Sequence, residues 1–219
     1  GRARARMPRT LILEPTRELA AQVEENFNKY GINHKLNVAL LIGGVSMDVQ
    51  MKKLDRGADV LIATPGRLLD LFERGRILMN GVEILVIDEA DRMLDMGFIK
   101  DIKYIVNKLP RKRHSLFFSA TLPKAVENII NSFLQNPISI SVRARQSAES
   151  VNQEIIKVGT QNKIELLHDL LIKPEFKKTI IFLRTKRAVD KLAKELTNRG
   201  FVVTLIHGNR SQSQRSKAL

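Results

Sequence analysis

Short runs of apolar residues recur along the chain, and each ends in a polar or glycine-containing stretch. In the first two thirds they cover residues 10–13, 38–42, 60–63, 84–87, 116–118 and 138–142. Runs of this length, rich in Val and Ile, are typical of strands buried on both faces of a parallel sheet. Between several of them, apolar residues recur every three or four positions. This spacing predicts helices ending near residue 30, around 68–72, and over 99–109 and 123–134.

The alternation of strands with helices predicts an α/β fold, a doubly wound and mainly parallel sheet. A polar stretch without periodicity, residues 143–152, interrupts it and is interpreted as a linker. Afterwards the pattern restarts, with expected strands at 155–158, 179–183 and 202–206. Helices are expected at 163–172 and 186–199, and a last one reaches residue 219. We therefore expect a first domain over 1–142 and the start of a second over 153–219.

Polar motifs follow directly after the predicted strands. They are PTRELA at 15–20, Gly43-Gly44, TPGR at 64–67, DEAD at 88–91, SAT at 119–121, and Gln212-Ser213-Gln214-Arg215 after His207-Gly208. Since open α/β sheets bind ligands beyond the carboxyl ends of their strands, we expect the motifs of the first domain to share one sheet edge.

The stretch Asp88-Glu89-Ala90-Asp91 ends the apolar run at 84–87. Three carboxylates placed there repel one another and need a cation or hydrogen-bond donors nearby. Many nucleoside triphosphatases hold Mg²⁺ at such a position and aim a water at the γ-phosphate. The alternative is an ordinary strand followed by an acidic helix start.

Two other motifs also have plainer interpretations. Taken alone, Ser119-Ala120-Thr121 equally fits a plain strand end, and Arg17 beside Glu18 fits a solvated helix face.

Charge favours a polyanionic partner. The 219 residues hold 37 Lys and Arg against 23 Asp and Glu, a net charge of +14. Residues 1–142 contribute 21 basic and 16 acidic residues (+5), and residues 143–219 contribute 16 and 7 (+9). Nucleic acid is favoured over an anionic membrane surface, although a merely basic, soluble surface would give the same totals.

Composition also excludes several classes of site. The sequence contains no cysteine, which excludes disulfides, thiolate zinc sites and cysteine nucleophiles. No apolar run approaches the ~20 residues of a membrane helix. With no secretory signal visible, we expect a cytoplasmic protein without a membrane partner.

Together, the motifs closely resemble those of the DEAD-box ATP-dependent RNA helicases, and the resemblance spans the whole chain. It implies two RecA-like domains, ATP and Mg²⁺ as cofactors, and RNA as partner. In this family the carboxylate at Asp88 helps to hold Mg²⁺, partly through water, and Glu89 orients the attacking water. Asp91 and the hydroxyl groups of Ser119 and Thr121 would form a bridge that links the nucleotide state to RNA binding.

The resemblance also implies contacts with the RNA backbone, and these give little sequence specificity. In the first domain they fall on Pro15, Thr16, Arg17, Gly43, Gly44, Thr64, Pro65, Gly66 and Arg67. In the second they fall on Arg184, Thr185, Gly208, Gln212 and Arg215. Arginine can grip a phosphate through two bonds, and glycine lets the backbone approach closely.

Three departures from the family pattern bear on activity. The chain contains no Gly-Lys pair, so the family's phosphate-binding loop is missing, as is its adenine-reading glutamine segment. The family's arginine-finger motif is missing as well. We therefore expect an internal fragment of a helicase that by itself neither binds ATP tightly nor hydrolyses it. An RNA clamp without hydrolysis and a DNA helicase of the same superfamily are the alternatives.

Overall fold

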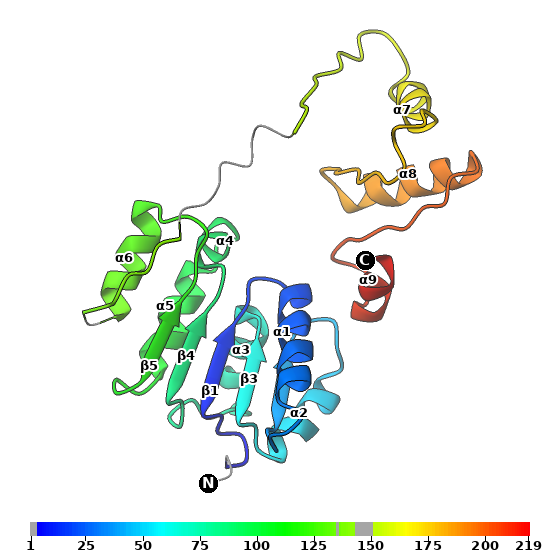
Figure 1. Ribbon diagram of the computed structural model, residues 1–219. Coiled ribbons are helices and arrows are strands. Elements are labelled where there is room, and N and C mark those ends of the chain that lie inside the picture. The colour runs from blue at the N-terminus through cyan, green and yellow to red at the C-terminus, as the bar shows by residue number, and fades with distance from the viewer. Residues whose placement is uncertain (1–3, 135, 143–150) are drawn as a thin grey trace. The chain divides into compact units, whose positions relative to one another are not determined.

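The computed structural model describes residues 4–134, 136–142 and 151–219 (Figure 1). The chain divides into two compact units, Gly1–Pro137 and Ile138–Leu219. In the described part of the chain, no helix is both long and apolar enough to cross a membrane.

A parallel five-stranded sheet forms the centre of the first unit. Its strands are β1 (Thr10–Leu13), β2 (Val38–Leu41), β3 (Val60–Ala63), β4 (Ile84–Ile87) and β5 (His114–Phe117), in the order β2-β3-β1-β4-β5. The chain first runs from β1 to the β2 edge and later crosses from β3 to β4 on the other side of β1. This reversal places a topological switch point between β1 and β4 and confirms the predicted doubly wound α/β fold.

Helices cover both faces of the sheet. Helix α1 (Arg17–Tyr30) packs against one face, where Ile12 and Ile62 contact Ala20. The opposite face belongs to the larger core, which includes Leu11 and Leu13. The helices that contribute to this core are α2 (Met47–Asp55), α3 (Pro65–Glu73), α4 (Ala90–Asp95), α5 (Ile99–Lys108) and α6 (Lys124–Phe133). Successive strand residues point to opposite faces, which explains why uninterrupted apolar runs are needed here.

The register of the sheet aligns the carboxyl ends of all five strands. Leu13 pairs with Ala63 and with Ile87, while Leu41 and Phe117 continue the same row on either side. Every first-unit motif starts within the few residues that follow this row. The motifs therefore share one edge of the sheet, as the sequence predicts.

The second unit contains three helices among its described residues: α7 (Lys163–Leu171), α8 (Lys186–Asn198) and α9 (Gln212–Ala218). Arg199 joins the first two, because its guanidinium binds both oxygens of Glu165 at 3.0 and 2.6 Å and also contacts Glu195. The His168 ring packs edge-on against Phe201 nearby. The predicted helices of this unit are confirmed.

The strands predicted at 138–142, 155–158, 179–183 and 202–206 are wrong for this structure, since none of these described residues forms a strand. Their side chains are 82–102% exposed at Ile138, Ile140, Ile155, Ile180, Phe182 and Val202. A strand requires a neighbouring strand to which its backbone is hydrogen-bonded, and none of these described segments is paired in this way. Of the predicted linker 143–152, residues 143–150 lie outside the described part of the chain.

Candidate functional site

An acidic corner, formed by Asp88, Glu89 and Asp91, follows β4 at the switch point. The Asp88 backbone N–H donates to the Leu13 carbonyl at 3.1 Å, and the Glu89 N–H donates to Asp88 Oδ1 at 2.9 Å. Glu89 has φ 46° and ψ 52°, a left-handed conformation that costs a non-glycine residue about 1–3 kcal/mol. Such strain is commonly found at functional sites, so this backbone favours the metal-site interpretation over a plain acidic helix start.

The carboxylate of Glu89 is paired with Arg92 at 3.0 Å. An open hollow of about 390 Å³ lies beside this pair and is lined by Glu89, Asp91, Arg92, Asp95 and Ala120. Its lining carries three carboxylates and one guanidinium, so the hollow is polar and accessible to water. Arg92 was missed by sequence reasoning, although its place three residues after Glu89 on a helix could have indicated the pair.

Asp91 is bound to the loop after β5. Asp91 Oδ2 accepts from the Thr121 hydroxyl at 2.7 Å and from the Thr121 backbone N–H at 2.9 Å. The Ser119 hydroxyl accepts from the Asp91 N–H at 3.2 Å and donates to the Thr121 carbonyl at 2.7 Å. The Thr121 hydroxyl is the main cause of the lowered pKa of Asp91, with the Thr121 N–H adding to it. The three predicted bridge residues are thus brought together, with Ser119 bound to the backbone of Asp91.

Glu14 lies at the end of β1 next to the acidic corner, and sequence reasoning missed it. Its side chain is 1% exposed, and neither carboxyl oxygen has a hydrogen-bond partner. Burial, together with the negative charges of Asp88 and Glu89, raises the pKa of Glu14 to about 8. A charged residue at the end of an apolar run was the available signal. With this pKa, Glu14 is mostly protonated at neutral pH, so the negative charge of the corner lies on Asp88, Glu89 and Asp91.

Three carboxylates beside a single guanidinium, that of Arg92, suit a hydrated divalent cation. The described residues contain no group of three or more His, Cys, Asp or Glu side chains that could enclose a metal ion. Mg²⁺ commonly uses one or two protein carboxylates and completes its shell with water and substrate phosphates. The half-buried Asp88 at the sheet edge, next to the carboxylate of Glu89, fits that mode of binding.

A glycine turn, residues 43–45, lies beyond β2 on the same edge of the sheet. A Cβ atom at Gly43 would lie 3.2 Å from Arg17 Nη2 and 3.3 Å from Nε, so the guanidinium packs directly on the glycine backbone. Gly44 has φ 78°, which L side chains rarely adopt. Arg67 Nη1 donates to the Val45 carbonyl at 3.3 Å. The two predicted arginines therefore meet opposite ends of one turn.

Two helix N-termini flank the same turn. Thr16 begins α1 and accepts from the Leu19 N–H at 3.3 Å, behind a buried Pro15. Thr64 begins α3 without a side-chain cap, Pro65 is buried, and no atom lies within 4 Å of a Cβ added to Gly66. Free N–H groups at helix starts attract phosphate.

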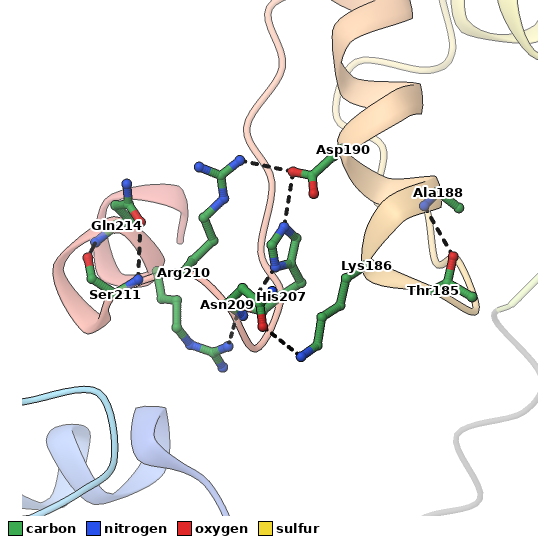
Figure 2. A network of polar contacts seen from close by, with 10 residues as sticks. Thr185, Lys186, Ala188, Asp190, His207, Asn209, Arg210, Ser211 and Gln214 are labelled. Atoms are coloured by element: carbon green, nitrogen blue, oxygen red, sulfur yellow. Dashed lines mark hydrogen bonds and ion pairs between the residues drawn. The ribbon is translucent and has the colours of Figure 1, made fainter.

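The predicted second-unit residues lie at the start of α8, where Figure 2 shows Thr185, and from Gly208 into α9. Thr185 caps α8 by accepting from the Ala188 N–H at 3.1 Å, and Arg184 precedes it, exposed. A Cβ atom added to Gly208 would lie 3.3 Å from Lys186 Cε, so the Lys186 side chain lies across this glycine. Gln212 opens α9, and Arg215 Nη1 donates to the His207 carbonyl at 3.2 Å.

His207 and Asp190 hold this turn in place (Figure 2). His207 Nδ1 accepts from the Asn209 N–H at 3.3 Å, so Nε2 carries the proton and donates to Asp190 Oδ1 at 3.1 Å. Arg210 Nη2 donates to the same oxygen at 3.0 Å. The hydrogen bond from His207, with help from Arg210, lowers the pKa of Asp190. Sequence reasoning placed His207-Gly208 before the last motif but missed Asp190.

Comparisons with known proteins agree with this arrangement. The family model described as DEAD/DEAH box helicase matches residues 2–129, and the helicase conserved C-terminal domain model matches residues 162–219. A protein named DEAD-box ATP-dependent RNA helicase 52A, from Oryza sativa subsp. japonica, is 42% identical over 98% of this chain and 38% of its own length. The crystal structure of a DEAD box protein from the hyperthermophile Methanococcus jannaschii is 35% identical and has a TM-score of 0.59. That match covers 99% of this chain and 57% of the other, so the chain spans roughly two fifths to three fifths of these relatives.

Proposed function

The chain belongs to the DEAD/DEAH box helicase family. On that basis we propose that its sheet edge is the part of an ATP-dependent RNA helicase that couples ATP hydrolysis to RNA binding and local unwinding. The observation that carries the proposal is the shared sheet edge. The acidic corner follows β4, and the glycine turn with its two arginines follows β2, on strands whose ends lie in one row.

The acidic corner supplies the groups for phosphoryl transfer. Asp88 would hold hydrated Mg²⁺, which would neutralise charge on the ATP phosphates. Glu89 would accept a hydrogen bond from the attacking water and orient it, once its carboxylate has left Arg92. Asp91 keeps the first turn of α4 attached to Thr121, so a shift of the loop after β5 would be transmitted to Glu89.

The glycine turn and the helix starts around it would grip RNA phosphates. Arg17 and Arg67 offer two-pronged donors, and the free N–H groups at the start of α3 point at the same edge. In the second unit, Arg184, Thr185, Gly208, Gln212 and Arg215 would contribute further backbone contacts. Recognition of this kind reads phosphates and sugars, so affinity would depend little on base sequence.

Nucleotide hydrolysis needs a group that cradles the β- and γ-phosphates. The 219 residues contain no Gly-Lys pair and therefore no phosphate-binding loop of the kind this family uses. We expect the 219-residue chain alone to bind RNA without releasing phosphate from ATP. Hydrolysis is a property to be measured on the full-length gene product.

Phosphate release from ATP by the full-length gene product, with and without RNA, tests the proposal. We expect single-stranded RNA to stimulate turnover and DNA of the same sequence to do so far less, because RNA-binding sites can sense the 2′-hydroxyl. Glu89→Gln should abolish turnover while ATP and RNA still bind. RNA binding without any stimulated hydrolysis would instead support the clamp, and equal stimulation by DNA would support a DNA helicase.

A further inference from the structure

Gln50 lies on α2, and its side chain reaches back to the glycine turn, residues 43–45. It is 3% exposed, which is unusual for an uncharged polar side chain of this length. Its Oε1 accepts from the Ile42 N–H at 3.1 Å, and its Nε2 donates to the Ile42 carbonyl at 3.1 Å. Nε2 also donates to the Val45 carbonyl at 3.1 Å and, more weakly, to the Ser46 carbonyl at 3.4 Å.

The chemistry of these bonds requires a glutamine. Ile42 directly follows β2, an edge strand, and its backbone N–H and carbonyl are both buried where no neighbouring strand is paired with them. A primary amide offers one acceptor and two donors, and so replaces the missing peptide group. Glutamate would lose the donors, leucine would lose both functions, and either change would leave buried backbone groups unsatisfied.

The same amide binds the turn that both arginines contact. The Val45 carbonyl accepts from Gln50 Nε2 and also from Arg67 Nη1 at 3.3 Å. At the other end of the turn, Gly43 follows Ile42 and carries the guanidinium of Arg17 against its backbone. Two consecutive glycines would otherwise sample many conformations, because glycine has the least restricted backbone. Fixing Ile42 and Val45 removes that freedom before any ligand binds.

We propose that Gln50 is a positioning residue for RNA binding, which sets the spacing of Arg17 and Arg67 by holding the turn between them. The proposal rests on the function inferred above, and it assigns to Gln50 a role without direct contact to RNA. A preorganised turn binds more tightly because less conformational entropy is lost on binding. A residue that merely stabilised the fold would instead affect RNA affinity no more than any equally destabilising core change.

Fluorescence anisotropy with fluorescein-labelled decauridine and the 219-residue chain tests this. Gln50→Leu should weaken binding about tenfold at low salt. It should also lower the slope of log affinity against log salt by about 0.7 for each phosphate that the variant no longer binds. The matched control is Val106→Ala in α5, a buried core residue that does not touch the turn. At a temperature where both variants are folded, the control should bind like the unmodified chain.

A double-mutant cycle with Arg67→Ala gives the discriminating result. If Gln50 acts through Arg67, the effect of Gln50→Leu should shrink clearly when Arg67 is already absent, whereas Val106→Ala should combine additively. Full additivity of Gln50→Leu with Arg67→Ala would overturn the proposal. So would equal affinities of Gln50→Leu and Val106→Ala.

Three further outcomes are decisive. If Gln50→Leu fails to fold, Gln50→Glu takes its place, because it keeps the acceptor for the Ile42 N–H. Gln50→Glu should show a smaller loss of RNA affinity. An RNA affinity of Gln50→Glu equal to that of the unmodified chain would overturn the proposal. If the unmodified chain did not bind decauridine at all, the proposed RNA-gripping function would fail, and the role of Gln50 with it. Binding by the unmodified chain with no effect at Gln50 would overturn the role of Gln50 alone.

Discussion

The hydroxyl group of Thr121 donates a 2.7 Å hydrogen bond to Oδ2 of Asp91 and thereby joins the loop after β5 to the first turn of α4. Asp91 stands two residues after Glu89, whose backbone is held in a left-handed conformation. A change at the β5 loop therefore has a short covalent and hydrogen-bonded route to the carboxylate proposed to orient water. Both this route and the groups around it can be tested by substitution.

Removing the Thr121 hydroxyl should raise the pKa of Asp91 toward its ordinary value. In the fold this pKa is lowered, so the stabilisation by Asp91 is present above the ordinary aspartate pKa and disappears as pH falls through the folded value. Thr121→Val should therefore be less stable than the unmodified chain at neutral pH, with the difference closing in acid. Carboxyl ¹³C NMR titration measures the shift. Ser132→Ala, which removes a hydroxyl bonded to the Ile129 carbonyl, is the control and should leave Asp91 unchanged.

Replacing Glu14 by glutamine should stabilise the first unit at pH 8 and above. Because the pKa of Glu14 rises to about 8 on folding, from an ordinary value of 4.5, the chain loses stability as pH rises between these two values. Glu14→Gln cannot ionise and should lack this loss. Thermal unfolding from pH 4.5 to 9 in the presence of EDTA checks it. Parallel stability profiles for Glu14→Gln and the exposed-site control Glu73→Gln would contradict the account.

Arg67→Ala should weaken RNA binding to a similar extent for uridine, adenosine and cytidine oligomers. A phosphate contact carries no base information, so the loss should be uniform, and the salt dependence should fall by about 0.7 in slope. The control is Arg74→Ala directly after the same helix, where the guanidinium is paired with Asp70 at 2.6 Å. A base-dependent loss, or an equal loss at Arg74, would argue against a phosphate contact at Arg67.

The hydrogen bonds around His207 predict one tautomer of its ring, with the proton on Nε2. The Asn209 N–H occupies Nδ1, and Asp190 accepts from Nε2, so a single tautomer is fixed. Long-range ¹⁵N NMR spectra at pH 8 distinguish the tautomers directly, with the exposed His34 as an internal reference. Asp190→Ala should mix the tautomers of His207 and leave His34 unaltered. A mixed tautomer signal from His207 in the unmodified chain would show that the turn is held differently.

The sequence predicted the first unit well because its strands are buried on both faces, which leaves uninterrupted apolar runs such as 60–63. Parallel strands then force the residues after each run onto one edge, so the placement of the motifs followed from their order. Helix α2 was missed because it buries Gln50 beside Leu54, and a buried glutamine hides the apolar period. Glu14 was missed because its raised pKa comes from burial and from the nearby charges of Asp88 and Glu89, both of which arise only in the fold.

In the second unit, the apolar runs did not predict whether a segment pairs into a sheet. Residues 179–183 have the composition of a strand, yet Ile180 and Phe182 are 82% and 90% exposed. Apolar residues indicate that a segment is suited to a sheet, whereas pairing depends on neighbours elsewhere in the chain. Helices satisfy their own backbone hydrogen bonds, which is why α7 and α8 formed as predicted.

The acidic corner and the glycine turn should influence each other along one sheet edge, and the proposed coupling of ATP hydrolysis to RNA binding depends on that influence. It is measured by the affinity of the full-length gene product for decauridine, with and without a non-hydrolysable ATP analogue and Mg²⁺. We predict that the analogue strengthens RNA binding at least tenfold and that Thr121→Val removes most of this gain. Equal RNA affinity in the presence and absence of the analogue would contradict it.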